Sequence, residues 1–411
     1  MKINFLENIK SLFGIKSNPI HGNSTTHIPM LGCSNASSSG VYVTESSSLG
    51  LPTVWACVQV LAQTISALPL SLIKVTKDGK FVDLTSNLTR LVARRPNSEM
   101  TALQWRSLIM FNLGLNGNHY SEIERNNAGD PIALWPIEPW RVTPTRVDGK
   151  LIYEVQVDNG KSIFLFPEEI LHFKGLAGDG IVGISPIKAH CEAVGIGLAA
   201  QVSSGKFYSN DSVPSGILTT EQKIDEETRA NIRKAWEKGH KGLENHHKVA
   251  IIDAGMKFNS ISVSPADAKL IEQKKLTRED IAQIYRIPQH KVGIMERSTN
   301  NNIEQQAIEF GTDTIKPWTT NIEQELLIKL VPEKEWDTSY FRHDLADMMR
   351  GDSGAMSNFF HNARIDGWMN ADEIRAIQDM NPLPEGRGKV YLVQANMTEL
   401  EADMSKDSTQ T

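Results

Sequence analysis

The sequence lacks the motifs that the common classes of enzyme require. A nucleotide-hydrolysing protein needs a GxxxxGK[ST] loop, in which backbone amides hold the phosphates and the final hydroxyl binds Mg²⁺. The nearest candidate, EGRGKV at 385–390, has Val390 in place of that hydroxyl and no Gly five residues before Gly388. The segment GCSNA at 32–36 fails the GxSxG pattern of acyl-transfer nucleophiles at its last position. We therefore expect no enzyme activity and no cofactor.

Cysteine is scarce as well. The chain of 411 residues holds three, Cys33, Cys57 and Cys191, and no two of them have CxxC spacing. An odd number without metal-ligand spacing is typical of reduced thiols in a cytosolic protein, which is the expectation here.

Histidines and carboxylates gather at two places without forming a convincing metal site. His240, His246 and His247 lie near Glu244, but a zinc site needs a fourth ligand and fixed spacing, so solvated histidines are favoured. The best carboxylate cluster follows one histidine, and its members are His343, Asp344, Asp347 and Asp352. A metal-dependent nuclease would use such a group. Carboxylates at helical spacing more often form a solvated face, so we expect no bound metal.

Excess positive charge and long apolar spans are also missing. The net charge is −6, which argues against a protein that coats nucleic acid by bulk electrostatics, although a protein that encloses DNA without gripping it remains compatible. Residues 46–73 carry no charge, but Pro69 should end their helix near Ala67. A helix over 53–67 spans roughly 22 Å, short of the roughly 30 Å of a bilayer core. We expect a core helix and no membrane contact.

The N-terminal half predicts an α+β domain. Residues 1–48 contain a short amphipathic helix and a Ser-, Thr- and Asn-rich linker, without the pattern of a signal peptide. From 70 to 175, alternating apolar residues and the turns Asp78-Gly79, Asp148-Gly149 and Asn159-Gly160 indicate antiparallel hairpins around a helix at 101–116.

The middle of the chain changes character at Ser185-Pro186. Residues 187–208 are typical of one helix rich in small residues, including Gly195 and Gly197. Glycine inside a helix is unfavourable by roughly 1 kcal/mol relative to Ala. A simple kink explains it, and so does the close approach of a neighbouring helix, either in another subunit or within the chain. The sequence leaves these alternatives open.

The second half predicts a small insert and then more helices. Residues 213–262 show a strand–helix–strand–strand pattern with nearly balanced charges, which suits a protein partner better than DNA. A helix over 263–288 leads to a polar loop at 289–302. A long helix over 303–330 should be kinked or broken by Pro317. Near the end of the chain, Asn370 and Glu373 predict a capping box at the start of a short helix.

Taken in order, these stretches resemble the portal proteins of tailed bacteriophages of the siphovirus type. The residues that carry the resemblance are the apolar helix at 53–73, RRPNSEMT at 94–101, NGNHYSEIERNNAGDPIALWPIEP at 116–139, EEILHFKG at 168–175, DGIVGISPI at 179–187, EDIAQIYRIP at 279–288, the Asn-rich loop at 297–302 and GWMNADEIRAIQDMNPLPEG at 367–386. Their order along residues 50–395 is far more specific than any one of them.

The resemblance implies an α+β portal fold that assembles as a ring. Its parts would be the N-terminal helix and linker (1–48), the wing (49–184), a stem helix (185–212), the clip (213–262), a second stem helix (263–288), the tunnel loop (289–302), a long kinked wing helix (303–345), the crown (346–395) and a disordered tail (396–411).

The resemblance also implies a function. The chain would be a virion protein, assembled in the host cytoplasm into a dodecameric ring at one capsid vertex, through which double-stranded DNA is packaged and ejected. Its partners would be the terminase large subunit, a head–tail adaptor and the major capsid protein. The tunnel loop would offer DNA weak, sequence-independent contacts from Lys291, Arg297, Ser298, Thr299, Asn300, Asn301 and Asn302. The clip would offer protein partners Arg229, Arg233, Lys234, Trp236 and Lys238.

Two other classes remain open. One is a metal-dependent DNA-processing enzyme built around His343, Asp344 and Asp347. The other is a soluble adaptor that never forms rings and stays monomeric at all concentrations.

Overall fold

The computed structural model describes residues 37–77, 79–157, 160–209, 216–219, 225–228, 230–231, 257–260, 265–294, 306–345, 353–378 and 380–392. The predicted N-terminal helix and the acidic tail at 396–411 lie outside these residues. The chain divides into two compact units, Met1–His343 and Asp344–Thr411.

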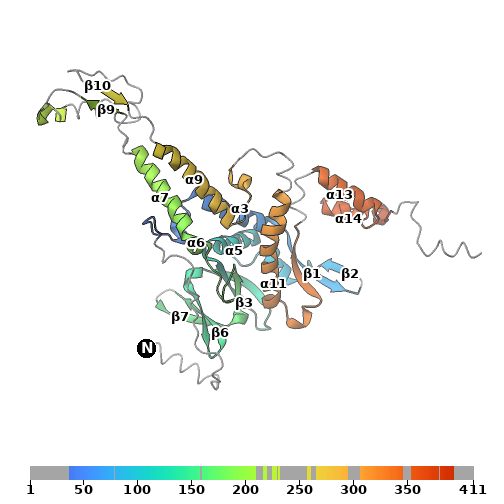
Figure 1. The fold of residues 1–411 in the computed structure, drawn as a ribbon. Helices are drawn as coiled ribbons and strands as arrows, with labels where there is room; N and C mark the ends of the chain where they lie inside the picture. Colours follow the sequence, from blue (N-terminus) through green and yellow to red (C-terminus); the bar gives the residue numbers. More distant parts are fainter. Residues whose placement is uncertain are drawn as a thin grey trace, which may run out of the picture. The chain divides into compact units, whose positions relative to one another are not determined.

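Two helices form the centre of the first unit. α3 (Pro52–Ala67) packs against α5 (Ala102–Asn116), and Figure 1 shows them beside the strands. α3 is buried as the predicted core helix and ends at Ala67, as Pro69 predicted. α5 brings Trp105, fully buried, into the same core. Buried Arg106 donates to the carbonyl of Leu68 at 2.6 Å, so a cation satisfies an orphan carbonyl just beyond the end of α3.

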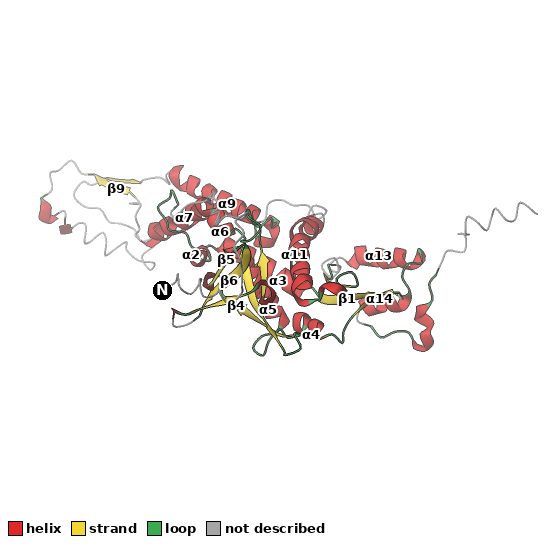
Figure 2. Cartoon of the chain, turned by 90° about the horizontal axis from the view of Figure 1, so that it is seen from below, coloured by secondary structure: helices red, strands yellow, loops and turns green. Residues whose placement is uncertain are grey.

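Three antiparallel sheets surround these helices, which confirms the predicted α+β class. Their strand orders are β4-β3-β8, β5-β6-β7 and β11-β1-β2, and Figure 2 shows β4, β5 and β6 in the body of the unit. The strands are β1 (Leu70–Thr76), β2 (Gly79–Val82), β3 (Asn118–Arg125), β4 (Pro131–Ile137), β5 (Val142–Val147), β6 (Lys150–Gln156), β7 (Ser162–Leu165), β8 (Ile170–Lys174) and β11 (Ser339–His343).

Local turn chemistry and one long-range pairing together produce these sheets. The β5–β6 hairpin turns at Asp148 and Gly149, which have φ of +50° and +79°, as the Asp-Gly signal predicted. β1 also pairs with β11, with Leu72 opposite Phe341, so a late segment completes an early sheet. Shorter elements connect the rest: α2 (Glu45–Ser48), α4 (Asn87–Ala93), η1 (Pro139–Arg141), η3 (Pro167–Glu169) and η7 (Glu333–Glu335).

The helix expected over 303–330 is interrupted in an unexpected way. Residues 306–309 are helical, η6 (Phe310–Ile315) is a π-helix, and α11 (Lys316–Leu330) continues as α-helix. Pro317 has no N–H to donate to an earlier carbonyl, and a widened turn just before it accommodates that loss. The sequence predicted a kink or a break at Pro317, whereas the structure shows a π-helical turn just before it and a helix that continues to Leu330.

The region predicted as one helix over 187–208 contains two. α6 (Pro186–Ala189) ends at His190, and α7 (Cys191–Ser209) follows and lies beside α9 (Pro265–Ile284). β9 (Gly216–Thr219) and β10 (Lys257–Ser260) pair antiparallel, as expected for two strands of the insert. A Cβ on Gly197 would meet the Thr277 and Leu51 side chains at 3.0 and 3.1 Å, and one on Gly195 would overlap Ser37. Crossings within the chain therefore account for both glycines.

The second unit is helical. It contains α13 (Ser353–Ile365), α14 (Ala371–Ile377) and η8 (Pro384–Lys389). Asn370 accepts from the Glu373 amide at 2.9 Å, and the Glu373 carboxylate accepts from the Asn370 amide at 2.8 Å. This is the capping box that the sequence predicted.

The cysteines agree with the expectation at Cys57 and differ from it at Cys191. Cys57 is a free buried thiol, and burial raises its pKa to about 12. Cys191 is disulfide-bonded, with a partner outside the described residues, so the prediction of three reduced thiols is wrong.

In the described part of the chain, every helix is too short or too polar to cross a membrane.

Glycine substitutions test how tightly the first unit is packed. A Cβ on Gly183 would overlap the carbonyl oxygen of Gly117. Gly183→Ala should therefore lower the free energy of unfolding by more than about 2 kcal/mol, measured by chemical denaturation. The matched control is Gly205→Ala on α7, where a Cβ has nothing within 4 Å. It should stabilise the chain by up to about 1 kcal/mol. Equal stability of the two variants would contradict the packing described.

Candidate functional site

Three of the sequence landmarks meet at the start of α6, within the first unit. Gly117 has φ of +71° and ends α5, and its carbonyl accepts from the Gly175 amide at 2.8 Å. A Cβ on Gly117 would overlap the carbonyl of Ile184. These backbones approach so closely that only glycine fits at Gly117 and Gly183. We call the residues Gly117, Asn118, Gly175, Gly183 and Ser185 the glycine junction.

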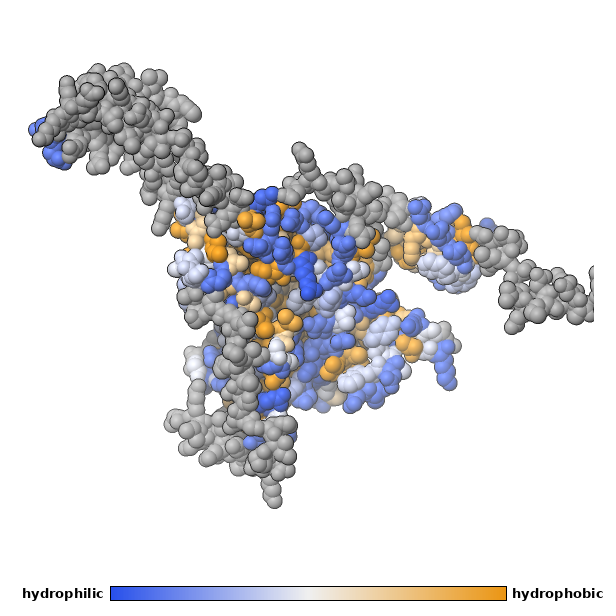
Figure 3. Space-filling view, in the orientation of Figure 1, coloured by the Kyte–Doolittle hydropathy of each residue, from blue (hydrophilic) through white to orange (hydrophobic). Residues whose placement is uncertain are grey.

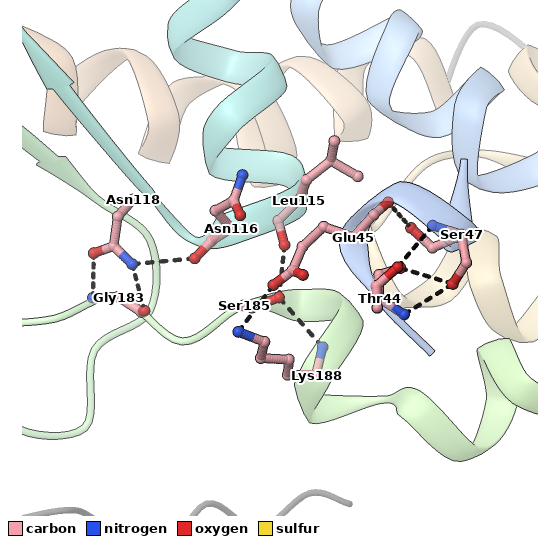
Figure 4. Close-up of polar contacts among 10 residues, drawn as sticks. Thr44, Glu45, Ser47, Leu115, Asn116, Asn118, Gly183, Ser185 and Lys188 are labelled. Atoms are coloured by element: carbon pink, nitrogen blue, oxygen red, sulfur yellow. Dashed lines mark hydrogen bonds and ion pairs between the residues drawn. The ribbon is translucent and has the colours of Figure 1, made fainter. Parts of the chain in front are cut away.

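Side chains complete the glycine junction, as Figure 4 shows. Asn118 accepts from the Gly183 amide at 2.7 Å and donates to the Gly183 carbonyl at 2.8 Å. Ser185 donates to the carbonyl of Leu115 at 2.6 Å and accepts from the Lys188 amide at 3.2 Å. One hydroxyl therefore caps α6 and ties it to the end of α5.

A segment before α3 also holds this region. The Glu45 carboxylate forms an ion pair with the Lys188 ammonium at 3.1 Å (Figure 4). Farther along, the Ser38 hydroxyl donates to Glu192, which lies in the first turn of α7, at 2.6 Å. Residues 38–45 therefore fix the starts of both α6 and α7.

Two buried histidines lie close to the glycine junction, and burial keeps them neutral. His119 accepts from the Asn112 amide at 3.0 Å and donates to the Ser121 hydroxyl at 3.0 Å. His172 donates to Asn118 at 3.1 Å and accepts from the Tyr153 hydroxyl at 3.2 Å. Burial lowers the pKa of His119 to about 3 and holds the pKa of His172 well below its usual range.

Side chains of helix α11, including two carboxylates, form hydrogen bonds with strands β8 and β11. Glu325 accepts from the backbone amide of His172 at 3.0 Å, and burial raises the pKa of its carboxyl. Glu323 accepts from both the backbone amide and the ring of His343, at 2.7 and 2.8 Å. Asn321 donates to the Lys174 carbonyl at 2.6 Å. α11 therefore bonds to β8 through Asn321 and Glu325, and to β11 through Glu323 on another side of the helix.

The polar loop predicted at 289–302 has a defined base. η5 (Gln289–Val292) begins it, and the His290 ring bonds the Gln306 amide oxygen at 2.8 Å across the loop. The Lys291 ammonium lies 5.1 Å from the centroid of the Phe310 ring, in cation–π geometry. We call the residues His290, Lys291, Gln306 and Phe310 the loop base, because they join the two ends of this segment.

Most of the predicted contact residues lie outside the described part of the chain. Lys291 is described and exposed, in the loop base. The remaining tunnel-loop residues are not described: Arg297, Ser298, Thr299, Asn300, Asn301 and Asn302. The same holds for the side chains of the predicted clip contacts: Arg229, Arg233, Lys234, Trp236 and Lys238. Their roles stay predictions.

The candidate metal clusters find no support among the described residues. There, no group of three or more His, Cys, Asp or Glu side chains is placed to hold a metal ion. His343 bonds Glu323 on α11 and lies at the end of β11. Asp347, Asp352, His240, His246 and His247 lie outside the described residues.

Comparison with known proteins identifies the family. The model of the family described as phage portal protein matches residues 52–379. The portal protein of Enterobacteria phage HK97 is 31% identical over 343 residues, which cover 82% of this chain and 80% of that protein. The chain belongs to the phage portal protein family. The resemblance seen in the sequence is thereby confirmed, and the protein is a portal protein of a phage-type virion.

Other relatives agree with this portal assignment. The probable portal protein of Streptomyces phage phiC31 is 29% identical over 378 residues, 88% of this chain and 81% of that protein. Among solved structures, a chain in the virion of a native gene transfer agent particle superposes with a TM-score of 0.60 at 20% identity, covering 82% of this chain and 94% of that one. An HK97-family phage portal protein from Corynebacterium diphtheriae superposes with a TM-score of 0.52 at 16% identity, covering 76% and 99%.

The segments of the glycine junction are recognisable in the sequence, but nothing in the sequence indicates that they meet. The available signal was three glycines, each in a separate landmark. Two of them lie within two residues of a short polar side chain, at Gly117-Asn118 and Gly183-Ile184-Ser185. The pairing of His172 with Asn118 had no such signal, because the two residues lie on different strands far apart along the chain.

The neutral histidines predict a pH dependence of stability. Because folding lowers their pKa, their contribution is full above the unfolded pKa of about 6.5 and is lost as pH falls toward about 3. Each should reduce the unfolding free energy by about 1.4 kcal/mol per pH unit below 6.5. Urea denaturation at several pH values measures this slope. His119→Gln, which does not titrate, should lower the slope by one such increment, and an unchanged slope would refute the assignment.

Proposed function

We propose that twelve copies of this portal protein form a ring at one capsid vertex and that double-stranded DNA passes through its central channel during packaging and ejection. The observation that carries this proposal is the family match over residues 52–379. A second supports the number of subunits: the neck of a native gene transfer agent particle, computed with C12 symmetry, contains a chain that superposes with a TM-score of 0.58 at 20% identity.

The proposed role is mechanical rather than catalytic. A sliding duplex needs contacts that are weak and independent of sequence, since each strong phosphate contact would hold the DNA in place. The net charge of −6 fits a channel that encloses DNA without gripping it. No catalytic step is assigned to the chain.

The tunnel loop is proposed as the element that contacts DNA. Its base holds Lys291, whose exposed ammonium rests on the Phe310 ring. Arg297 and the neutral groups of Ser298 to Asn302 would add weak contacts to phosphate. The bond from His290 to Gln306 supports this proposal, because it holds the two ends of the loop together.

The clip, residues 213–262, is proposed as the docking site for the terminase large subunit during packaging and then for a head–tail adaptor. The support is its balanced charge and its position between α7 and α9 in the sequence. Arg229, Arg233, Lys234, Trp236 and Lys238 are the proposed contacts. The major capsid protein is the proposed partner at the vertex.

The ring is tested by mass photometry of the purified chain across a concentration series, with and without co-expressed capsid protein. We expect a species of about twelve subunits in at least one condition. A strict monomer that capsid protein also fails to recruit to a single vertex would refute the ring and favour the adaptor hypothesis.

The tunnel loop is tested by replacing residues 295–302 with Gly-Ser-Gly, which leaves buried Ile294 and the loop base in place. We expect rings to assemble as in the natural protein and the yield of filled heads to fall at least about tenfold, because the DNA contacts are lost. Deletion within residues 398–411 is the matched control and should leave ring assembly intact. Normal packaging by the loop variant would remove the loop from the proposal.

The competing enzyme hypothesis has its own test. A metal-dependent nuclease would cut DNA in the presence of Mg²⁺ or Mn²⁺, and Asp344→Ala with Asp347→Ala would abolish that activity. We expect neither cleavage nor ATP turnover by the natural protein, and intact head assembly by the variant. Cleavage lost in the variant would show that the chain is more than a conduit.

A further inference from the structure

The end of α9 holds an arginine in a backbone conformation that favours glycine. Arg286 has φ of +53°, in the left-handed region. Its amide donates to the Gln283 carbonyl at 3.0 Å, and the Ile287 amide donates to the Ala282 carbonyl at 3.0 Å. This pair of bonds is the Schellman motif, in which the residue at the position of Arg286 is usually glycine. An arginine there carries a steric cost that glycine would avoid.

The contacts around Arg286 hold its backbone and leave its side chain exposed. Tyr285 is buried and donates to the Gly114 carbonyl at 2.9 Å, and Ile287 is buried on the other side. Thr314, within the π-helix η6, donates its hydroxyl to the Arg286 carbonyl at 2.7 Å. These contacts use the backbone of Arg286 or the residues beside it, so glycine at this position would keep them all. The fold therefore needs the left-handed turn but not the arginine side chain.

The exposed guanidinium of Arg286 lies next to a second cation. Within the described residues, no carboxylate forms an ion pair with Arg286. Lys291 lies over the ring of Phe310, the first residue of η6, and the Arg286 carbonyl is bonded to the same short helix. The exposed residues from 283 to 293 are neither acidic nor apolar: Gln283, Arg286, Lys291 and Gly293. Two cations therefore contact one element beside the loop base.

We propose that Arg286, together with Lys291, contacts the phosphate backbone of the double-stranded DNA in the channel. This inference rests on the proposed function and adds to it a contact residue outside the tunnel loop. A guanidinium without a carboxylate partner binds phosphate well, and a contact to phosphate is independent of base sequence. Glu309 and Asp313 are exposed on the neighbouring helical segment, and their negative charge weakens the attraction, as a sliding duplex requires.

The other partner for such an arginine is a carboxylate on a second copy of the chain. The centre of an interface between subunits is mostly apolar, whereas the exposed residues around Arg286 are polar. The surface therefore fits phosphate better than a neighbouring subunit, and the experiment distinguishes the two.

The contact is tested in assembled heads of the full-length protein that carry a photo-crosslinking amino acid at position 286. We expect crosslinks to DNA in filled heads. The same probe at position 150, an exposed residue of the β5–β6 hairpin, should give no crosslink to DNA. Crosslinks from position 286 to a second copy without any to DNA would assign the arginine to a subunit contact. That result, or the absence of crosslinks from position 286, would overturn the proposal.

Two substitutions separate the role of the side chain from that of the backbone. Arg286→Gly relieves the left-handed strain, so it should lower the equilibrium constant of unfolding by about fivefold, measured by urea denaturation. Because it also removes a phosphate contact, the yield of filled heads should fall by about threefold. Arg286→Lys keeps the charge and should retain the filling without the gain in stability. Lower stability of Arg286→Gly, or unchanged filling, would overturn the proposal.

Mass photometry of the same variants separates this contact from the ring. Both should form the rings of the natural protein, and a loss of rings in Arg286→Gly would overturn the contact with DNA in favour of one between subunits. If the natural chain fills heads while position 286 fails these tests, the contact alone is refuted. If the natural chain forms no rings and fills no heads, the proposed function and the contact are refuted together.

Discussion

The architecture of the first unit depends on three backbones that meet at the glycine junction. The Gly117 carbonyl receives the Gly175 amide, and Gly183 lies against the same carbonyl with no room for a Cβ. This contact brings together the end of α5, the end of β8 and the segment that starts α6. Since α7 follows α6 directly, the direction of this long helix is set by an approach that only backbone atoms can make.

Such close backbone packing removes polar groups from water, and the surrounding side chains replace the lost hydrogen bonds. Asn118 satisfies both backbone groups of Gly183, and its oxygen also accepts from His172. His172 bonds Tyr153 in turn, and its backbone amide bonds Glu325 on α11. A network whose members are all satisfied fixes one arrangement, whereas a single missing partner leaves a buried polar group at considerable free-energy cost. The neutral state of the histidines follows from the same burial.

The sequence predicted those features whose cause is local. Pro69 ends α3, Asp148-Gly149 turns the β5–β6 hairpin, and Asn370 caps α14 because each acts on residues within a few positions. The pairing of β1 with β11 was not predictable in this way, because no local sequence pattern indicates that Leu72 and Phe341, which lie far apart along the chain, are opposite each other. The close approach that Gly195 and Gly197 indicated is present. Only the structure shows that Ser37, Thr277 and Leu51 are the neighbours. For the candidate site, the order of landmarks in the sequence indicated the family. The loop base could be recognised only from the structure, which shows the contact between Gln306 and His290.

The loop base also determines how force on the proposed tunnel loop would reach the body of the first unit. Contacts that let DNA slide must each be small, so any force on the proposed tunnel loop reaches the body through its attachment. Phe310, beneath Lys291, is buried and opens the π-helix η6, where Thr314 bonds the carbonyl of Arg286 at 2.7 Å. η6 continues into α11, whose carboxylates bond β8 and β11. A π-helical turn is the less stable part of this path, because its hydrogen bonds are less favourable than those of an α-helix. If the loop moves as DNA passes, that turn is where the path yields, while the strands behind it keep their positions.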